Sequence, residues 1–260
     1  MFRMYGTTEA RRTLDPKYMT GYLKQAQWAE HIELKKIVAE LFERKGSPID
    51  IDDIGIGEAR VPINLAEIDE IRDCIGKYHG IDIDDVVLRT ARRNVRKHNL
   101  QDKVIVEKFD ARNLSQFLSF PPRYDGVFCT YFTPGDFPYD SYKFTAKKQH
   151  VDYLEIKNAF QRVFRPAYDL IQPSGKLILG SLYKNNEPTA AKQREFYKKC
   201  GMTVISKPTD PFTATKEGFW SLRFSEERIM DYLDFVQPEK IELRDLDTYD
   251  FAQMVIVSKD

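Results

Sequence analysis

The sequence lacks net charge, paired cysteines and long apolar runs, and each lack argues against a class of protein. Lysine and arginine number 40, as do aspartate and glutamate, so no overall field would attract nucleic acid or an anionic membrane. Cys74, Cys129 and Cys200 are far apart and form no Cys-x-x-Cys pair, which argues against a disulfide framework or a zinc site. No apolar run reaches the roughly 18 residues of a membrane helix. We therefore expect a soluble, cytoplasmic protein with free thiols and no membrane contact.

The length of 260 residues suits one large α/β domain with additions. We expect residues 1–48 to form an N-terminal helical cap and residues 49–260 to form the main domain. Asp15-Pro16 is typical of a helix entry, and the apolar spacing from Tyr18 to Arg44 predicts helix, as one segment or two.

The most informative stretch runs from Ile49 to Arg60. An apolar-alternating segment ends at Asp53 and is followed by Gly55 and Gly57, which is typical of a buried strand that leads into a tight turn. Glycine leaves out the Cβ atoms that would hold a ligand away, permits positive φ and leaves N–H groups free to face the ligand. Because ordinary turns also contain Gly-x-Gly, the later strands must decide between a ligand site and a plain turn.

Apolar periodicity and turn residues predict strands that alternate with helices. The seven strands expected for the sheet are Ile49–Ile54, one ending at 80–84, Lys103–Phe109, Tyr124–Thr130, Lys176–Tyr183, Lys240–Leu246 and Ala252–Ser258, and Met202–Lys207 is a further candidate strand within the irregular segment 184–222. The expected helices are Val61–Lys77, Val86–His98, Val151–Ile171, Ala190–Cys200 and one starting after Ser225. This order predicts an α/β fold with a doubly wound, mostly parallel sheet of seven strands whose last strand is antiparallel.

Polar residues follow the predicted parallel strands where each strand ends. Asp53, Asp82 and Asp110 follow the first three, and Thr130 and Tyr131 follow the fourth. Ligands of such sheets bind outside the carboxyl ends of the strands, so these side chains should gather at one site. The alternative is that the acids only cap the following helices.

Two segments interrupt the alternation, and we expect them to form insertions over the site. Residues 133–152 combine aromatic, turn-forming and polar residues, and residues 184–222 are the least regular part of the chain. Together with the N-terminal helices they would enclose a small organic molecule. His150 lies in the first insertion and is the candidate general base, with Tyr131 as a second candidate catalytic residue.

The stretch Asp53-Ile54-Gly55-Ile56-Gly57-Glu58-Ala59 resembles the D-x-G-x-G-x-G motif of the Rossmann-like (class I) S-adenosylmethionine-dependent methyltransferases, with Ala59 in place of the last glycine. The Pro173-Ser174-Gly175 turn and the paired last strands are also similar to that family, and the resemblance extends from Ile49 to the C-terminus. By contrast, the 27-residue separation of Gly55 from Asp82 and the absence of a glycine at Arg60 argue against a nicotinamide dehydrogenase.

The resemblance implies S-adenosyl-L-methionine as the cofactor and assigns roles to its neighbours. Asp82 would hold the two ribose hydroxyls, and Asp110 with the Ala111 N–H would hold the adenine. The implied cofactor-binding set is Asp53, Gly55, Gly57, Asp82, Ile83, Asp110, Ala111 and Thr130.

The methyl acceptor is less defined by the sequence. The segment Cys129-Thr130-Tyr131-Phe132-Thr133-Pro134 stands where nucleic-acid methylases of the family carry Asn/Asp-Pro-Pro-Tyr/Phe. We therefore expect a metal-independent enzyme that methylates N or O of a small organic molecule, with nucleic acid disfavoured. The alternatives are a methyltransferase of RNA or protein that uses the basic helix face at 89–97, and a non-catalytic, cofactor-binding interaction subunit. The sequence leaves the oligomeric state undecided, and a homodimer is one option.

Overall fold

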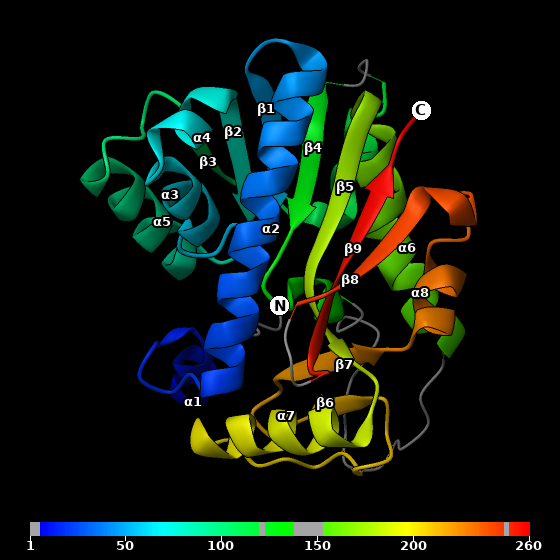
Figure 1. Cartoon of the computed structure of the whole chain (residues 1–260). Coiled ribbons are helices and arrows are strands. Elements are labelled where there is room, and N and C mark those ends of the chain that lie inside the picture. Colours follow the sequence, from blue (N-terminus) through cyan, green and yellow to red (C-terminus); the bar gives the residue numbers. More distant parts are fainter. Residues whose placement is uncertain (1–5, 120–122, 138–152, 247–249) are drawn as a thin grey trace.

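The computed structural model describes residues 6–119, 123–137, 153–246 and 250–260 (Figure 1). Its central sheet has the strand order β3-β2-β1-β4-β5, all parallel, followed by antiparallel β9 and then by β8. This confirms the predicted doubly wound sheet of seven strands. The seven strands are β1 (Ile49–Ile54), β2 (Ile75–Asp82), β3 (Val104–Lys108), β4 (Tyr124–Cys129), β5 (Ile171–Lys184), β8 (Ile241–Asp245) and β9 (Ala252–Ser258).

Two further strands form a hairpin that the sequence did not predict. β6 (Phe212–Ala214) pairs antiparallel with β7 (Trp220–Phe224), and β7 pairs parallel with the last two residues of β5. The helices are α1 (Thr8–Arg11), α2 (Gly21–Lys45), α3 (Arg60–Ala66), α4 (Asp69–Cys74), α5 (Asp85–Lys97), α6 (Tyr153–Asp169), α7 (Glu187–Lys199) and α8 (Glu226–Tyr232).

Alternating side chains along the strands point to opposite faces of the sheet and pack into two apolar cores. On β9, Met254 and Ile256 join the core that also contains residues of α2 and α5, whereas Val255 and Val257 join the core that contains residues of α6 and α8. This period of two is the expected consequence of burying both faces of a parallel sheet. α1 and the α7–β6–β7 unit lie beyond the carboxyl ends of the strands, at the bottom of Figure 1.

Several predicted boundaries are wrong, and each has a local cause. The predicted helix Val61–Lys77 is two short helices followed by the start of β2 at Ile75. Gly76 allows β2 to begin there, because a Cβ on it would lie 3.0 Å from Asp50 Oδ1, the atom that accepts a hydrogen bond from the Lys77 N–H. Residues 202–207 form no strand and contribute only the bridge between Val204 and Thr215.

The N-terminal segment also differs from its prediction. The sequence predicted one or two helices between Tyr18 and Arg44, and the structure has one, α2. It begins at Gly21 rather than after Asp15-Pro16. The division of the chain at residue 48 stays a prediction. The insertion at 133–152 lies outside the described residues from position 138 onward, whereas the segment at 184–222 folds as α7, β6 and the first part of β7.

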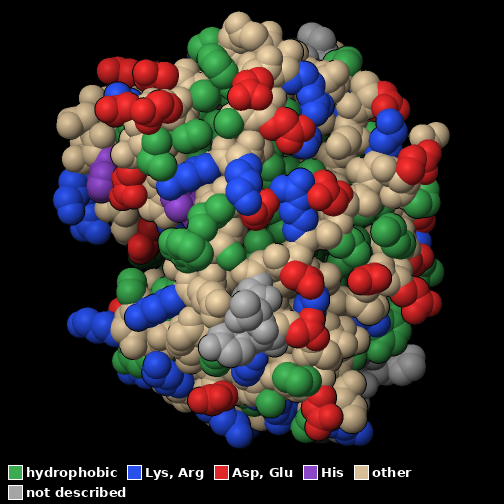
Figure 2. Space-filling view, viewed as in Figure 1, with side chains coloured by type: hydrophobic (Ala, Val, Ile, Leu, Met, Phe, Trp, Pro, Cys, Tyr) green, Lys and Arg blue, Asp and Glu red, His purple; other side chains and the backbone are tan. Residues whose placement is uncertain are grey.

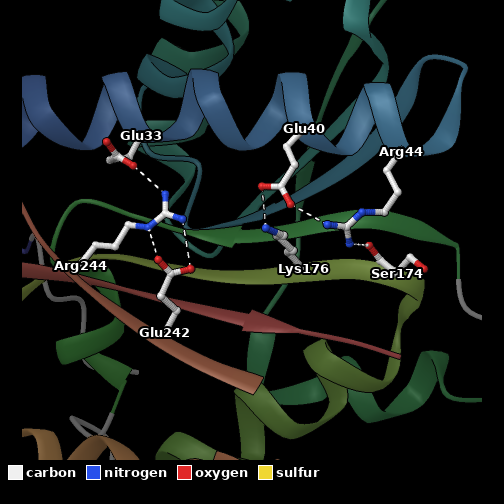
Figure 3. Close-up of polar contacts among 7 residues, drawn as sticks. All are labelled: Glu33, Glu40, Arg44, Ser174, Lys176, Glu242 and Arg244. Atoms are coloured by element: carbon white, nitrogen blue, oxygen red, sulfur yellow. Dashed lines mark hydrogen bonds and ion pairs between the residues drawn. The ribbon is translucent and has the colours of Figure 1, made fainter. Parts of the chain in front are cut away.

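Ion pairs fix α2 across the sheet (Figure 3). Glu33 Oε2 lies 2.7 Å from Arg244 Nη1 on β8, and Glu40 Oε2 lies 2.8 Å from Lys176 Nζ on β5. Arg44 Nη1 donates to the Ser174 carbonyl over 2.9 Å. Both ion pairs are partly exposed to solvent, since the Glu40 and Arg244 side chains are 42% and 31% exposed. Solvent-screened pairs contribute up to about 1 kcal/mol each, so these pairs orient α2 more than they stabilise it.

The outer surface carries no charge of one dominant sign in the view of Figure 2, where basic and acidic side chains are interspersed. This agrees with the formal net charge of +0. Among the described residues, no helix is both long and apolar enough to cross a membrane.

Candidate functional site

The turn after β1 has the conformation that its glycines predict. Gly55 and Gly57 have φ values of +78° and +57°. A Cβ on Gly55 would lie 2.7 Å from the Thr133 side chain, so any other residue there would have to displace this side chain. Ala59, in place of the last glycine of the motif, keeps the left-handed conformation with φ 65° and precedes the first residue of α3. The turn thus retains the expected backbone despite the alanine.

Asp82 is fixed at the carboxyl end of β2 next to this turn. Its Oδ2 accepts from the Gly57 N–H over 3.2 Å and its Oδ1 from the Asp84 N–H over 3.0 Å. Burial raises the pKa of Asp82, while these two backbone hydrogen bonds act in the opposite direction. Each oxygen keeps a further lone pair, so the carboxylate can accept hydrogen bonds from two vicinal hydroxyl groups.

Asp110 follows β3, and the Arg112 guanidinium fixes its carboxylate with two hydrogen bonds. Arg112 donates from Nε to Oδ1 over 2.8 Å and from Nη2 to Oδ2 over 2.5 Å. Burial acts to raise the pKa of Asp110, but the hydrogen bonds from Arg112 outweigh it and lower the pKa. The Asp110 carboxylate is therefore a fixed anion with spare acceptor capacity.

These strand ends open into one cavity of about 740 Å³. Its volume lies in the range of small-molecule sites, roughly 300–1,000 Å³. The sequence-predicted residues that line it are Gly55, Gly57, Asp82, Ile83, Asp110, Ala111, Thr130 and Tyr131. Leu14 and Pro16 from the N-terminal segment and Phe196 and Phe219 from the 184–222 segment also line it, so the predicted enclosing segments do reach the site.

Two predicted site residues are not among the lining residues. Asp53 is 1% exposed, and its Oδ2 accepts from the Tyr78 hydroxyl over 2.7 Å. Burial raises the pKa of Asp53 to about 7, and its Oδ1 has no hydrogen-bond partner among the described residues. The structure thus places Asp53 behind the glycine turn rather than on the cavity wall. His150 lies outside the described residues.

The chain after β4 is strained where it borders the cavity. Tyr131 and Phe132 have φ values of 53° and 64°, which are unfavourable for residues with a Cβ. The Arg60 guanidinium lies 4.8 Å from the centroid of the Tyr131 ring. Burial raises the pKa of Tyr131 to about 12, and Tyr131 lines the cavity. Its catalytic role stays a prediction.

A buried glutamate on α2 supports this strained pair. Glu30 is 0% exposed, and its Oε1 accepts from Arg60 Nη2 over 2.7 Å. Its Oε2 accepts from the Tyr131 N–H over 2.9 Å and from the Ser181 hydroxyl over 2.6 Å. A Cβ on Gly180 would lie 2.6 Å from the same Oε2, so this glycine makes room for the carboxylate. Glu30 thus links the N-terminal helix to the site.

A further carboxylate, that of the half-buried Asp136, lines the cavity beside Tyr197 and Ser221. Asp136 Oδ1 and Ser221 Oγ are buried and have no hydrogen-bond partner among the described residues. Burial raises the pKa of Asp136 well above its usual range. This end of the cavity is otherwise aromatic, with Phe132 stacked on Tyr183 at a centroid distance of 3.9 Å.

Sequence reasoning missed Glu30, Arg60, Asp136, Tyr197 and Ser221 as site residues. Glu30 lies in a helix where an acid normally faces solvent, and its partners Tyr131 and Ser181 are distant in the sequence. Asp136 lies in the segment predicted to cover the site, but nothing local signals that it is buried against Ser221. Among the aromatic residues of this region, Tyr131, Phe132 and Phe219 line the cavity and Trp220 does not.

Neither a family model nor a curated protein matches the sequence. Solved structures are similar to it over most of their length. The methyltransferase CcbJ from Streptomyces caelestis is 14% identical with a TM-score of 0.57, covering 89% of this chain and 95% of that one. An S-adenosylmethionine-dependent methyltransferase from Clostridium acetobutylicum is 11% identical with a TM-score of 0.53, covering 86% and 90%.

A third neighbour is an O-methyltransferase from Bacillus cereus, solved in complex with SAH. It is 12% identical with a TM-score of 0.50, and the match covers 97% of this chain and 87% of that one. At these identities the likeness establishes the fold. The chain therefore has the Rossmann-like fold of the class I methyltransferases, as its motif predicted.

Proposed function

We propose that this protein is an S-adenosylmethionine-dependent methyltransferase that transfers a methyl group to N or O of a small organic molecule. The observation that carries the proposal is the single cavity that joins the glycine turn, Asp82 and Asp110 to an aromatic chamber. The fold alone would be compatible with many functions, so the proposal depends on these residues.

The residues at the strand ends fit the cofactor. Gly55 and Gly57 bring backbone close to the cavity without Cβ atoms, which suits the methionine portion. The Asp82 carboxylate suits the ribose hydroxyls, and Asp110 with the Ala111 N–H suits the adenine ring. Bound there, the cofactor would supply an electrophilic methyl group on a sulfonium.

The other end of the cavity fits a small acceptor. Tyr183 and Phe132 form an aromatic floor, and Phe196 and Phe219 come from the segment that covers the site. Methyl transfer is an in-line displacement, so holding the acceptor in line and keeping water out supply much of the rate. A chamber enclosed by the N-terminal segment and the 184–222 segment is suited to both tasks.

Asp82→Asn tests the cofactor half, because it keeps the shape of the side chain and removes its charge. Hydrogen bonds to a charged group contribute about 1.5–3 kcal/mol, so the dissociation constant for S-adenosylhomocysteine should rise roughly tenfold or more. Asp69→Asn is the matched control, since its side chain is 76% exposed on α4, and it should leave the affinity unchanged. Equal affinities of both variants and the parent protein would remove Asp82 from the site.

A second candidate function, methylation of RNA, is favoured by one observation. The five basic residues of α5 that the sequence singled out are all exposed: Arg89, Arg92, Arg93, Arg96 and Lys97. An RNA acceptor held by this face would bind with a steep salt dependence, whereas binding of a small acceptor would hardly change with salt. A fluorescence titration with a short RNA at roughly 50 and 200 mM salt measures how the dissociation constant changes with salt. A steep change favours the RNA acceptor, and no RNA binding favours the small acceptor.

A further inference from the structure

The aromatic end of the cavity has one polar wall, which carries Asp136 and Ser221. This wall is formed by the start of the chain after β4 and by the β7 strand, which places Ser221 against it. A Cβ on Gly135 would lie 3.0 Å from Ser221 Oγ, so the two segments are in close contact here. Asp136, the residue after Gly135, lines the cavity beside this contact.

Among the residues that the structure describes, the Asp136 carboxylate has no charge partner. Its Oδ1 is buried and accepts no hydrogen bond of normal geometry from a described residue. The neighbouring Ser221 hydroxyl acts to lower its pKa, and no basic side chain of the described residues contributes to the shift. The Asp136 charge acts to raise the pKa values of Cys129, Tyr183 and Tyr197. All three groups are neutral at pH 7, so none of them balances the charge of Asp136. A buried carboxylate is costly unless it is paired or protonated, so a cationic ligand would satisfy it.

We propose that Asp136 binds a protonated amine of the methyl acceptor, so that the acceptor is an amine rather than an alcohol or a phenol. The inference rests on the proposed methyltransferase function and names the substrate class of the same site. The aromatic rings of Phe132, Tyr183 and Tyr197 around this position favour a cation further, because a ring face attracts positive charge.

The same contact prepares the acceptor for reaction. The ammonium gives one proton to Asp136, whose burial makes it a stronger base than an exposed carboxylate. The freed nitrogen lone pair then forms a bond to the methyl carbon while the carbon–sulfur bond breaks, and that bond's electron pair stays on sulfur. The product leaves as a methylated ammonium, and the proton on Asp136 passes to solvent when the site opens.

Matched amines and alcohols test this proposal by calorimetry on the full chain saturated with S-adenosylhomocysteine. The probes are benzylamine against benzyl alcohol and 2-phenylethylamine against 2-phenylethanol. In the parent protein each amine should bind about tenfold or more tightly than its alcohol, as expected for a charge-assisted contact. Asp136→Asn should remove this preference and leave the affinity for S-adenosylhomocysteine within about twofold, a range smaller than the loss of one hydrogen bond.

The outcomes that overturn the proposal are distinct from failure of the methyltransferase function. If neither amine binds more tightly than its alcohol, or if Asp136→Asn keeps the preference, Asp136 does not select an amine. If the substitution weakens S-adenosylhomocysteine and the amines alike, Asp136 belongs to the cofactor half of the cavity. Should S-adenosylhomocysteine fail to bind the parent protein while the amine preference persists without it, the methyltransferase function fails and amine recognition stands.

Discussion

Glu30 offers a sharp test of how α2 is coupled to the site. Its carboxylate accepts hydrogen bonds from Arg60, the Tyr131 N–H and Ser181 at 2.7, 2.9 and 2.6 Å. Glu30→Gln keeps the volume but replaces one oxygen with an NH2 group, which must then face either the guanidinium or the other two donors. In either orientation the NH2 group, which is a donor, faces another buried donor, and a hydrogen bond to Glu30 is lost.

The cost follows from the burial of this pair. Removing one member of a buried ion pair costs about 3–5 kcal/mol. The Arg60 side chain is 22% exposed and can regain some hydration, so we expect the lower end, about 3 kcal/mol. Urea unfolding monitored by tryptophan fluorescence and circular dichroism measures this difference in the free energy of unfolding.

Glu33 on the same helix supplies the control for this experiment. It pairs with Lys36 and Arg244 near the surface, so Glu33→Gln should cost less than about 1 kcal/mol. A double-mutant cycle with Arg60→Gln should recover part of the Glu30→Gln cost, since the two residues are in contact. The reasoning is refuted if Glu30→Gln costs no more than Glu33→Gln.

Further predictions concern the turn and the pH dependence of stability. Gly55→Ala should destabilise the fold by at least about 1–2 kcal/mol, because its φ is +78° and its Cβ would meet Thr133. Gly21→Ala, which meets nothing within 4 Å, is the control and should be neutral in thermal unfolding. Burial acts to lower the pKa of His79, but the carboxylates beside it outweigh this and raise the pKa. Its contribution to stability is therefore full below the unfolded pKa near 6.5 and is lost as pH rises through the folded pKa. The Asp53 carboxyl, with a pKa of about 7, acts in the same direction, so the free energy of unfolding should fall between about pH 5 and 8.

Variants at these two positions check the pH prediction. His79→Gln and Asp53→Asn should each flatten the decline of stability with rising pH. A parent protein whose stability rises over that interval, or variants with unchanged slopes, would contradict the assigned pKa directions.

The sequence predicts the parts of this protein that depend on local pattern. β1 has the predicted bounds, since an alternating apolar run that ends at glycines admits few other structures. The same logic located the ends of β2 and β3 and hence brought Asp82 and Asp110 to one cavity. Even the alanine in the motif was tolerated, because its methyl group is buried and its backbone takes the left-handed conformation.

What the sequence could not predict depends on tertiary contacts. The start of β2 was assigned to a helix because Ile75-Gly76-Lys77 becomes a strand only through its pairing with β1. The roles of Glu30 and Asp136 depend on residues far away in the chain: Ser181 donates to Glu30, and Ser221 lies beside Asp136. A single sequence does not record such pairs, so the cofactor half of the site was more predictable than the acceptor half.

Calorimetric titration with S-adenosylhomocysteine, with NAD in a parallel titration, tests the central claim most directly. The account predicts binding of S-adenosylhomocysteine at a dissociation constant on the order of micromolar, about −8 kcal/mol, and no binding of NAD. Binding of NAD, or no binding of S-adenosylhomocysteine by protein that circular dichroism shows to be folded, would contradict it.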